Sequence, residues 1–421
     1  MRALRIGVAL LSATVVVLAY SSSPQAFHSG GVAECGGCHS MHNPKPGGTF
    51  LLVGTDASSA CLTCHEGSAG SYHISTAVAD MPTGVAPLQR TAGGDFGWLK
   101  KDYTFTVRGT TSTEDGDTHG HNVVAADFGY LADPHNVTAP GGGNNSYSSS
   151  QLGCQSCHDP HGRARRLSDG TYVNAIYTPG STNAPIISSG SYHNSLTPAP
   201  GQAVGVYRLL RGVGDNTVGV TFDEAPIAIS PSTYNRTEAA TQTRVAYGSQ
   251  GANTWGNWCG TCHEGMHSNG NYVHPVDRAL TANVASNYNA YVKSCDLTGG
   301  SGTSYSSLVP FMEKNASITT LQGHANPANN YMNGPSSSDE VSCLSCHRAH
   351  ASGFMHALRW NMEGEFMTYD GMWPGTDTTP TVPQFARGRT SAETAAAYND
   401  RPATQFASYQ RVLCNKCHAK D

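Results

Sequence analysis

The chain has 421 residues, including 47 glycines and 22 prolines, and only 13% of its residues are charged, against roughly 25% in ordinary globular domains. The formal net charge is −5 at pH 7 and there is no dense basic stripe, which argues against a nucleic-acid-binding protein. With so many turn-forming residues, the chain needs something besides a dense apolar core to hold it together.

The first 26 residues predict a secretory signal peptide. A basic start, "MRALR", is followed by an apolar run from Ile6 to Ala19 and a small-residue exit, "SSSPQA". The run is shorter than the roughly 18 residues that a membrane helix needs, and no later segment comes closer. We therefore expect an exported protein without a membrane span, in which residues 27–421 form a single domain.

Regular secondary structure is predicted to be sparse along this domain. "YTFTV" (103–107) and "TVGVTF" (217–222) are candidate strands. An apolar stripe from Pro275 to Val292 predicts a helix, "TSAETAAAY" (390–398) predicts a short capped helix, and Pro402 to Leu413 predicts a helix leading into the last cysteine pair. Loops rich in Gly, Ser and Asn lie between them, so we expect a mostly irregular fold with a few short helices and minor strands.

Twelve of the thirteen cysteines fall in six copies of C-x-x-C-H, the haem c attachment motif, called sites 1 to 6 in chain order. The two thiols of each copy form thioether bonds to haem, and the histidine binds the iron on one face. The predicted haem-binding cysteines are Cys35, Cys38, Cys61, Cys64, Cys154, Cys157, Cys259, Cys262, Cys343, Cys346, Cys414 and Cys417. The predicted proximal ligands are His39, His65, His158, His263, His347 and His418. The thirteenth cysteine, Cys295, lies outside any motif, and we expect a solvent-facing thiol.

Zinc and thiol redox chemistry explain this pattern poorly. Zinc sites built from C-x-x-C need a second ligand pair each and do not require a histidine after every second cysteine. A thioredoxin-like motif is expected once, in a βαβ context, not six times among glycine-rich loops. Six covalent haems in one domain predict that the cofactors themselves form much of the core.

The sixth iron ligands must come from elsewhere in the chain. Thirteen histidines lie outside the motifs' proximal positions, more than six irons need, which favours His/His over His/Met ligation and low potentials. His42, His161 and His350 each follow a proximal histidine by three residues, so each can reach another haem but not the far face of its own. The other first-choice distal ligands are His73, His121 and His324, with His274, His267 and His28 in reserve. Four histidines are expected at the surface rather than on iron: His119, His135, His193 and His356.

Several segments resemble the hexahaem outer-surface cytochromes of metal-reducing bacteria. They include "FHSGGVAECGGCHSMH", "CHDPHG", "PSTYNRTEA", "CLSCHRAHASGF" and "YQRVLCNKCHAKD". The resemblance implies His/His ligation at every haem and an extracellular filament of stacked haems. It also implies that His42 binds the iron held at site 5 of the adjacent subunit. The implied location is the outer cell surface or beyond, with the periplasm as transit, and the implied partners are other outer-surface cytochromes and extracellular acceptors such as metal oxides or partner cells.

Three functions remain open from the residues alone. The first is a non-enzymatic electron conduit, which needs closely spaced cofactors that neighbouring histidines can tie together. The second is a multihaem reductase with one open haem, although all six motifs here end in histidine. The third is a monomeric periplasmic shuttle, because a signal peptide takes a protein only across the inner membrane.

Overall fold

The computed structural model describes residues 35–68, 72–141, 147–174, 184–217, 219–232, 238, 242–268 and 274–418, with the side chains of 267 and 268 left aside. The predicted signal segment and His28 lie outside these ranges. None of the helices in the described part of the chain is long and apolar enough to cross a membrane.

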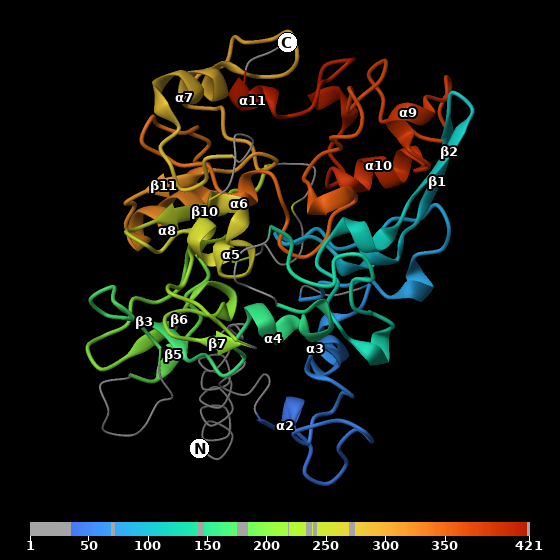
Figure 1. Cartoon of the computed structure of the whole chain (residues 1–421). Helices are drawn as coiled ribbons and strands as arrows, with labels where there is room; N and C mark the ends of the chain where they lie inside the picture. Colours follow the sequence, from blue (N-terminus) through green and yellow to red (C-terminus); the bar gives the residue numbers. More distant parts are fainter. Residues whose placement is uncertain are drawn as a thin grey trace, which may run out of the picture.

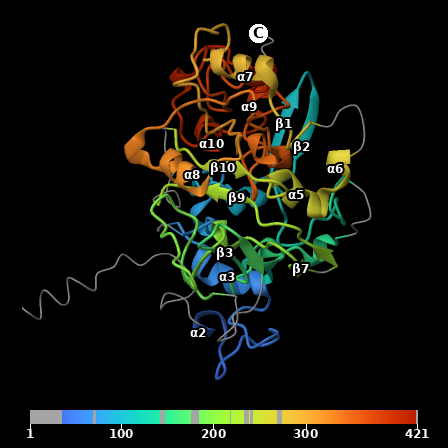
Figure 2. The ribbon, with the colours of Figure 1, turned by 90° about the vertical axis from the view of Figure 1, so that its left-hand side faces the viewer.

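The molecule is elongated, with helix α2 at one end and helices α7 and α11 at the other (Figures 1 and 2). Most of the chain between the helices is irregular, as predicted. The helices of the described residues are α2 (Cys35–Cys38), α3 (Ala57–His65), α4 (Cys154–Cys157), α5 (Trp255–His263), α6 (Gly265–Ser268), α7 (Thr281–Ala290), α8 (Ile318–Ala325), α9 (Pro383–Ala386), α10 (Ser391–Ala397) and α11 (Asn415–His418).

Four small sheets join segments from different parts of the chain. A hairpin of β1 (Tyr103–Val107) and β2 (Thr110–Glu114) projects from the side of the molecule (Figure 1). The four-stranded sheet has the order β4-β3-β6-β5, from β3 (Ala164–Leu167), β4 (Tyr172–Asn174), β5 (Ile186–Ser188) and β6 (Ala203–Gly205). The third has the order β11-β10-β9, from β9 (Ile227–Ile229), β10 (Ala246–Ser249) and β11 (Met312–Lys314). The fourth pairs β7 (Asn216–Thr217) with β8 (Val220–Thr221).

Short sequence patterns predicted the positions of one helix and one strand correctly. The capped helix is confirmed as α10, because the Thr390 side chain accepts a hydrogen bond from the Glu393 amide and the Glu393 carboxylate accepts one from the Thr390 amide. The strand at 103–107 is confirmed as β1. The strand predicted at 217–222 is instead part of a hairpin of two very short strands, β7 and β8.

Two predicted helices are wrong in extent. The apolar stripe from Pro275 forms a helix only from Thr281, because Asp277 and Thr281 adopt left-handed backbone angles, φ 58° and 68°. The helix predicted from Pro402 is a single 3-10 turn, Ala403–Gln405, since Phe406 is already extended. Helix formation resumes only at Asn415, within the last motif.

Two of the apolar clusters, including the largest, have motif cysteines packed against them. The largest is built around Trp360, Trp373 and Tyr398, and the last two stack with ring centres 4.4 Å apart. Cys346, Cys414 and Cys417 pack on this cluster, and Cys157 packs on a second one around Trp255. The core is therefore organised around the cysteine pairs.

Candidate haem sites

Each motif places its cysteines and histidine on one short turn. In sites 1, 3, 5 and 6 the histidine amide donates a hydrogen bond to the carbonyl of the first cysteine, at 2.7, 2.9, 2.9 and 3.0 Å. Sites 2 and 4 lie instead at the ends of the longer helices α3 and α5. In a helical turn, residues four apart share a face, so the first thiol and the imidazole point the same way.

Five proximal imidazoles each make the same kind of hydrogen bond, which leaves one ring nitrogen to bind a metal. In five sites Nδ1 lies 2.7 to 2.9 Å from a backbone carbonyl, so it carries the proton and donates it. The acceptors are Phe50 for His39, Tyr72 for His65, Arg208 for His158, Pro140 for His263 and His356 for His347. Such a bond fixes the tautomer and the ring direction and leaves Nε2 as the basic nitrogen.

Three proximal rings face a second histidine at a separation that suits one iron between them. Two imidazoles bound on opposite sides of a metal, each at roughly 2 Å, leave ring centres roughly 6 Å apart. The ring centres are 6.0 Å apart for His121 and His263, 6.2 Å for His158 and His350, and 6.2 Å for His274 and His418. The residues present therefore fit a haem ligated by two histidines at sites 4, 3 and 6.

Two of the facing histidines, His121 and His350, are also in the protonation state that metal requires. Desolvation, then the nearby His263, lowers the pKa of His121 to about 4. Burial, then His158, lowers the pKa of His350 to about 3. Both rings are neutral at physiological pH, and a neutral imidazole is the form that binds iron.

Neighbouring sites touch through their cysteines, starting with each odd site and the even site that follows. Burial and then the neighbouring Cys64 raise the pKa of the Cys38 thiol. Burial and then Cys262 raise the pKa of Cys157 to about 12. At sites 5 and 6, burial followed by Cys414 and Cys417 raises the pKa of Cys346 to about 12. These thiols become thioethers once haem is attached, so the shifts matter here as evidence that the sulfurs are close.

Each even site touches the next odd site through the first cysteine of both motifs. A hydrogen bond between the thiols of Cys61 and Cys154 raises the pKa of Cys61 and lowers that of Cys154. A hydrogen bond with the Cys343 thiol, followed by burial, raises the pKa of Cys259. The six sites thus form one unbranched series, in chain order, from α2 at one end of the molecule to α11 at the other (Figure 1).

The remaining ligand candidates are placed as follows. His42 and His161 are exposed, and His161 Nδ1 lies 3.6 Å from Asp159. His73 is 9% exposed, and burial and the nearby His65 lower its pKa. His324 Nδ1 lies 2.6 Å from Glu313, and its ring stacks on Tyr331 at 3.6 Å. His28 and the His267 side chain lie outside the described part, where these two predictions stay untested.

His119 differs from its prediction as a surface residue. It is fully buried, with Nδ1 3.0 Å from the Trp98 carbonyl and Nε2 2.9 Å from Glu114. The β1–β2 hairpin and the chain after it fold over this ring, which the sequence alone did not indicate. Because both nitrogens are engaged within the protein, neither is available to an iron.

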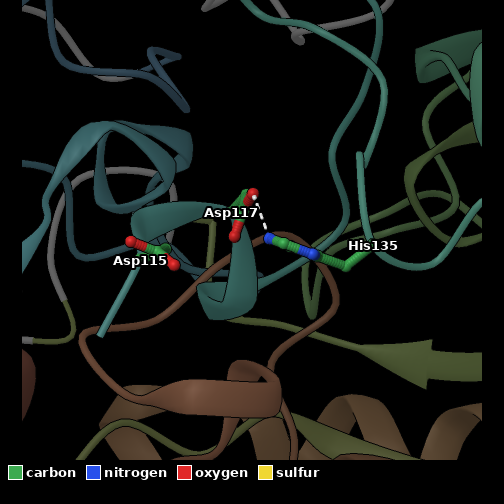
Figure 3. Close-up of side chains that lie close together, drawn as sticks. All are labelled: Asp115, Asp117 and His135. Carbon is green, nitrogen blue, oxygen red and sulfur yellow. Dashed lines mark ion pairs between the residues drawn. The ribbon is translucent and has the colours of Figure 1, made fainter. Parts of the chain in front are cut away.

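The other three histidines expected off the iron have protein partners. His135 is exposed, with Nε2 3.7 Å from Asp117 and with Asp115 close by (Figure 3). The Nδ1 of His193 accepts a hydrogen bond from the Ser232 amide at 3.3 Å. His356 serves through its carbonyl, which accepts the bond from His347. Cys295 is exposed, in agreement with the expectation of a solvent-facing thiol.

Comparison with known proteins accounts for this series of sites. The chain is 47% identical to the C-type cytochrome OmcS of Geobacter sulfurreducens over 442 aligned positions, which span 98% of this chain and 99% of that protein. The chain belongs to the OmcS family of c-type cytochromes. Two solved structures, OmcS nanowires by cryo-EM and an outer membrane cytochrome S filament, both from Geobacter sulfurreducens, match with a TM-score of 0.83 each. They are 46% and 47% identical and cover 94% of this chain and 100% of theirs. No protein-family model matches the chain.

As an OmcS-family cytochrome, the protein carries haem c and serves electron transfer rather than enzymatic turnover. When bound, haem c supplies an iron that changes between ferric and ferrous states. The protein's own residues fix the cofactor through thioether sulfurs, orient the imidazoles through backbone carbonyls, and bring neighbouring sites into contact.

The odd-numbered sites of this OmcS-family chain share a backbone arrangement that the even ones lack. In each, the carbonyl that accepts the proximal Nδ1–H belongs to the first of two consecutive residues in left-handed conformation. These left-handed pairs are Phe50–Leu51 (φ 56° and 58°), Arg208–Leu209 (52° and 51°) and His356–Ala357 (58° and 54°). The leucine after each pair forms a β-bridge with the proximal histidine, as Leu52 with His39, Leu210 with His158 and Leu358 with His347.

The hydrogen bonds around the left-handed pairs repeat as well. The residue after each proximal histidine donates to the carbonyl of the second left-handed residue: Ser40 to Leu51, Asp159 to Leu209 and Arg348 to Ala357, at 2.7, 2.8 and 2.7 Å. The residue after each leucine donates to the second cysteine: Val53 to Cys38, Arg211 to Cys157 and Arg359 to Cys346, at 3.0, 2.9 and 2.8 Å. The chain therefore consists of three successive two-site units, each an odd site followed by an even one.

Sequence reasoning did not detect this repeat. The irregular spacing of the motifs hides it, and non-glycine residues carry no signal for left-handed conformation. One signal was present: only the odd motifs have a second histidine three residues after the first, as "CHSMH", "CHDPH" and "CHRAH".

Proposed function

We propose that this chain is one subunit of an extracellular filament that conducts electrons along its haems to acceptors outside the cell. The family relationship supports it, because the similar solved structures are OmcS nanowires and filaments. The elongated shape supports it too, since site 1 and site 6 lie at opposite ends and a head-to-tail contact between them would continue the series (Figure 1).

The pairing of His350 with His158 carries the proposal. His350 is the second histidine of site 5, and its ring faces the proximal histidine of site 3, the odd site of the preceding unit. By the same rule, in which the second histidine of one odd site binds the iron of the preceding odd site, His161 of site 3 binds the iron held by His39 at site 1. His42 of site 1 has no preceding unit in its own chain, so it binds the iron held by His347 at site 5 of an adjacent subunit.

The odd-site geometry supports this register. No other described histidine ring forms a ring contact with His39 or His347 in the parts of the chain that the structure describes. His42 and His161 are both exposed and so are available to another molecule or to a rearranged loop. Because the ligand of site 5 comes from the next subunit, the contact between subunits repeats head to tail and builds an open filament.

The full ligand assignment follows from these contacts. The twelve motif cysteines attach six haems, and the six motif histidines are the proximal ligands. We assign His350, His121 and His274 as distal ligands of sites 3, 4 and 6, His161 to site 1 and the adjacent subunit's His42 to site 5. For site 2 the candidates are His73, which is buried beside His65, and His28. His324, a first-choice candidate from the sequence, and His267, a reserve one, are assigned to no site.

Export fits the same function. We propose that residues 1–26 are removed as a signal peptide and that residues 27–421 form the subunit, with the periplasm as transit. The electron acceptors we propose are metal oxides, partner cells and other outer-surface cytochromes, all too large to enter a haem pocket and therefore suited to a conductor rather than to a reductase site.

The test is a single substitution. His42→Ala should leave six covalent haems by mass but abolish filaments in electron micrographs, because site 5 loses the ligand that joins subunits. The matched control is His135→Ala, another exposed histidine, whose partner is Asp117; it should form filaments of normal length. Normal filaments from His42→Ala would refute the proposed junction.

A further inference from the structure

Site 6 contains a buried lysine between its two cysteines. Lys416 is 5% exposed, and its Nζ donates hydrogen bonds to the carbonyls of Tyr288 at 3.1 Å and Tyr291 at 3.0 Å. The ammonium also lies 4.2 Å from the centre of the Tyr288 ring. The lysine therefore caps the C-terminal end of helix α7 while remaining part of the haem-attachment turn α11.

The charge of this lysine is only partly compensated. No carboxylate forms an ion pair with Lys416 among the residues of 35–418 that the structure describes. The C-terminal end of a helix offers roughly half a negative charge, and carbonyl groups and an aromatic face carry no net charge. Because the group is buried, water and salt screen the remaining positive charge weakly.

None of the other five motifs has a charge at this position. The residue before the second cysteine is Gly37, Thr63, Ser156, Thr261 or Ser345 in sites 1 to 5. In sites 2, 3 and 4 the residue directly after the proximal histidine is acidic: Glu66, Asp159 or Glu264. Site 6 thus places a cation within the motif itself and lacks the acidic neighbour of sites 2, 3 and 4.

Site 5 lies in the same cationic region. Burial would raise the pKa of Glu238, but Arg401, Arg348 and Arg359 outweigh burial and lower it to about 2. One carboxylate therefore stands among three arginines, and Arg359 also donates to the carbonyl of His347 at 3.1 Å. Site 5 therefore has a cationic cluster of its own, and Lys416 is the charged residue within the motif of site 6.

We propose that Lys416 raises the reduction potential of the haem at site 6 above the value that this site would have without the charge, which lengthens the time that an electron rests there. This inference rests on the proposed attachment of haem to Cys414, Cys417 and His418. One-electron reduction, with the electron supplied by the neighbouring site, lowers the iron's charge by one, and a fixed buried cation favours that lower charge. The lysine acts through its charge and does not touch the iron.

The experiment compares three variants by potentiometric titration of the purified protein, followed by visible absorbance. In Lys416→Met, one component, about one sixth of the haem absorbance by the motif count, should move to lower potential. Lys416→Arg keeps the charge and should keep that component in place. A purely structural role in capping α7 would change the unfolding temperature of Lys416→Met without moving one component alone.

Several outcomes would overturn the inference. A Lys416→Met titration curve that superimposes on the parent curve would do so, as would an equal shift in Lys416→Arg. If Lys416→Met fails to fold, Lys416→Thr, which carries the residue of sites 2 and 4, replaces it under the same criteria. Haem mass and electron micrographs of each variant separate the two proposals, because the potentials of site 6 can be measured whether or not the protein polymerises.

Discussion

Site 1 and site 5 have the same backbone arrangement in opposite surroundings. At site 1, Met41 is 80% exposed, and Phe50, the first residue of the left-handed pair, is 83% exposed. The second residue of the pair is 49% exposed at site 1 (Leu51) and 6% exposed at site 5 (Ala357), and Trp360, beside site 5, is 1% exposed and belongs to the largest core cluster. The local hydrogen bonds therefore form the turn around the proximal histidine whether or not other residues bury it. At site 1 the described residues leave that turn exposed.

The largest expected difference between the two regions comes from removing an aromatic ring. Trp360→Ala should lower the free energy of unfolding by about 3 to 5 kcal/mol, because the ring is buried and leaves a cavity. Phe50→Ala should leave subunit stability almost unchanged and should raise the protein concentration needed for filaments. Thermal unfolding and electron microscopy measure the two effects, and equal losses of stability would erase the contrast.

The second-largest expected difference between the surroundings of site 5 and those of site 1 comes from buried charge. Glu238 is 0% exposed, and its pKa of about 2 lies below the roughly 4.3 of an unfolded glutamate. Because the folded pKa is depressed, its contribution to stability is complete above about pH 4.3 and is lost as the pH falls towards 2. Glu238→Gln should cost about 3 kcal/mol at pH 7, since it leaves buried arginines without their carboxylate, and much less near pH 2.

The matched control for Glu238 lies near site 1. Asp127 is exposed and pairs with Lys45 at 3.4 Å, where water screens the interaction. Asp127→Asn should therefore leave unfolding curves from pH 2 to 7 close to those of the parent protein. A pH-independent loss in Glu238→Gln would show that its charge is not what stabilises the third unit.

The smallest expected effect concerns the left-handed pairs. Leu51 has φ 58° and is half exposed, so Leu51→Gly removes backbone strain while sacrificing little packing. We expect it to stabilise the turn at site 1 by about 1 kcal/mol, seen as slower hydrogen exchange of the Ser40 amide that bonds to Leu51. Leu51→Val, with a β-branched side chain that resists this conformation, should speed the same exchange.

Features encoded within a few residues could be predicted from the sequence. Haem attachment needs two thiols and an imidazole on one turn, so each attachment site is encoded by five consecutive residues. The helix at Ser391 was predictable for the same reason, since Thr390 and Glu393 form its capping box locally. The scarcity of regular structure followed from the many turn-forming residues.

Features that depend on distant partners could not be predicted. His158 meets His350 only because the third unit folds back against the second, and no local pattern links them. Arg208 and His356 keep a left-handed backbone because their own carbonyls accept hydrogen bonds from the proximal imidazoles and the next carbonyls accept hydrogen bonds from backbone amides. The helix expected from Pro275 failed for a related reason: the backbone turns at Asp277 to meet the segment around Val341.

The separation of His158 from His350 also orders events in time. The two residues are 192 positions apart (350 − 158), so at 5 to 20 residues per second roughly 10 to 40 s of synthesis pass between them. During that interval the second unit has its own cysteines, proximal histidine and left-handed pair, but not the imidazole that completes its odd site. A stalled or truncated chain would thus be marked by an incompletely ligated site in the last unit made, a chemical signature of unfinished molecules.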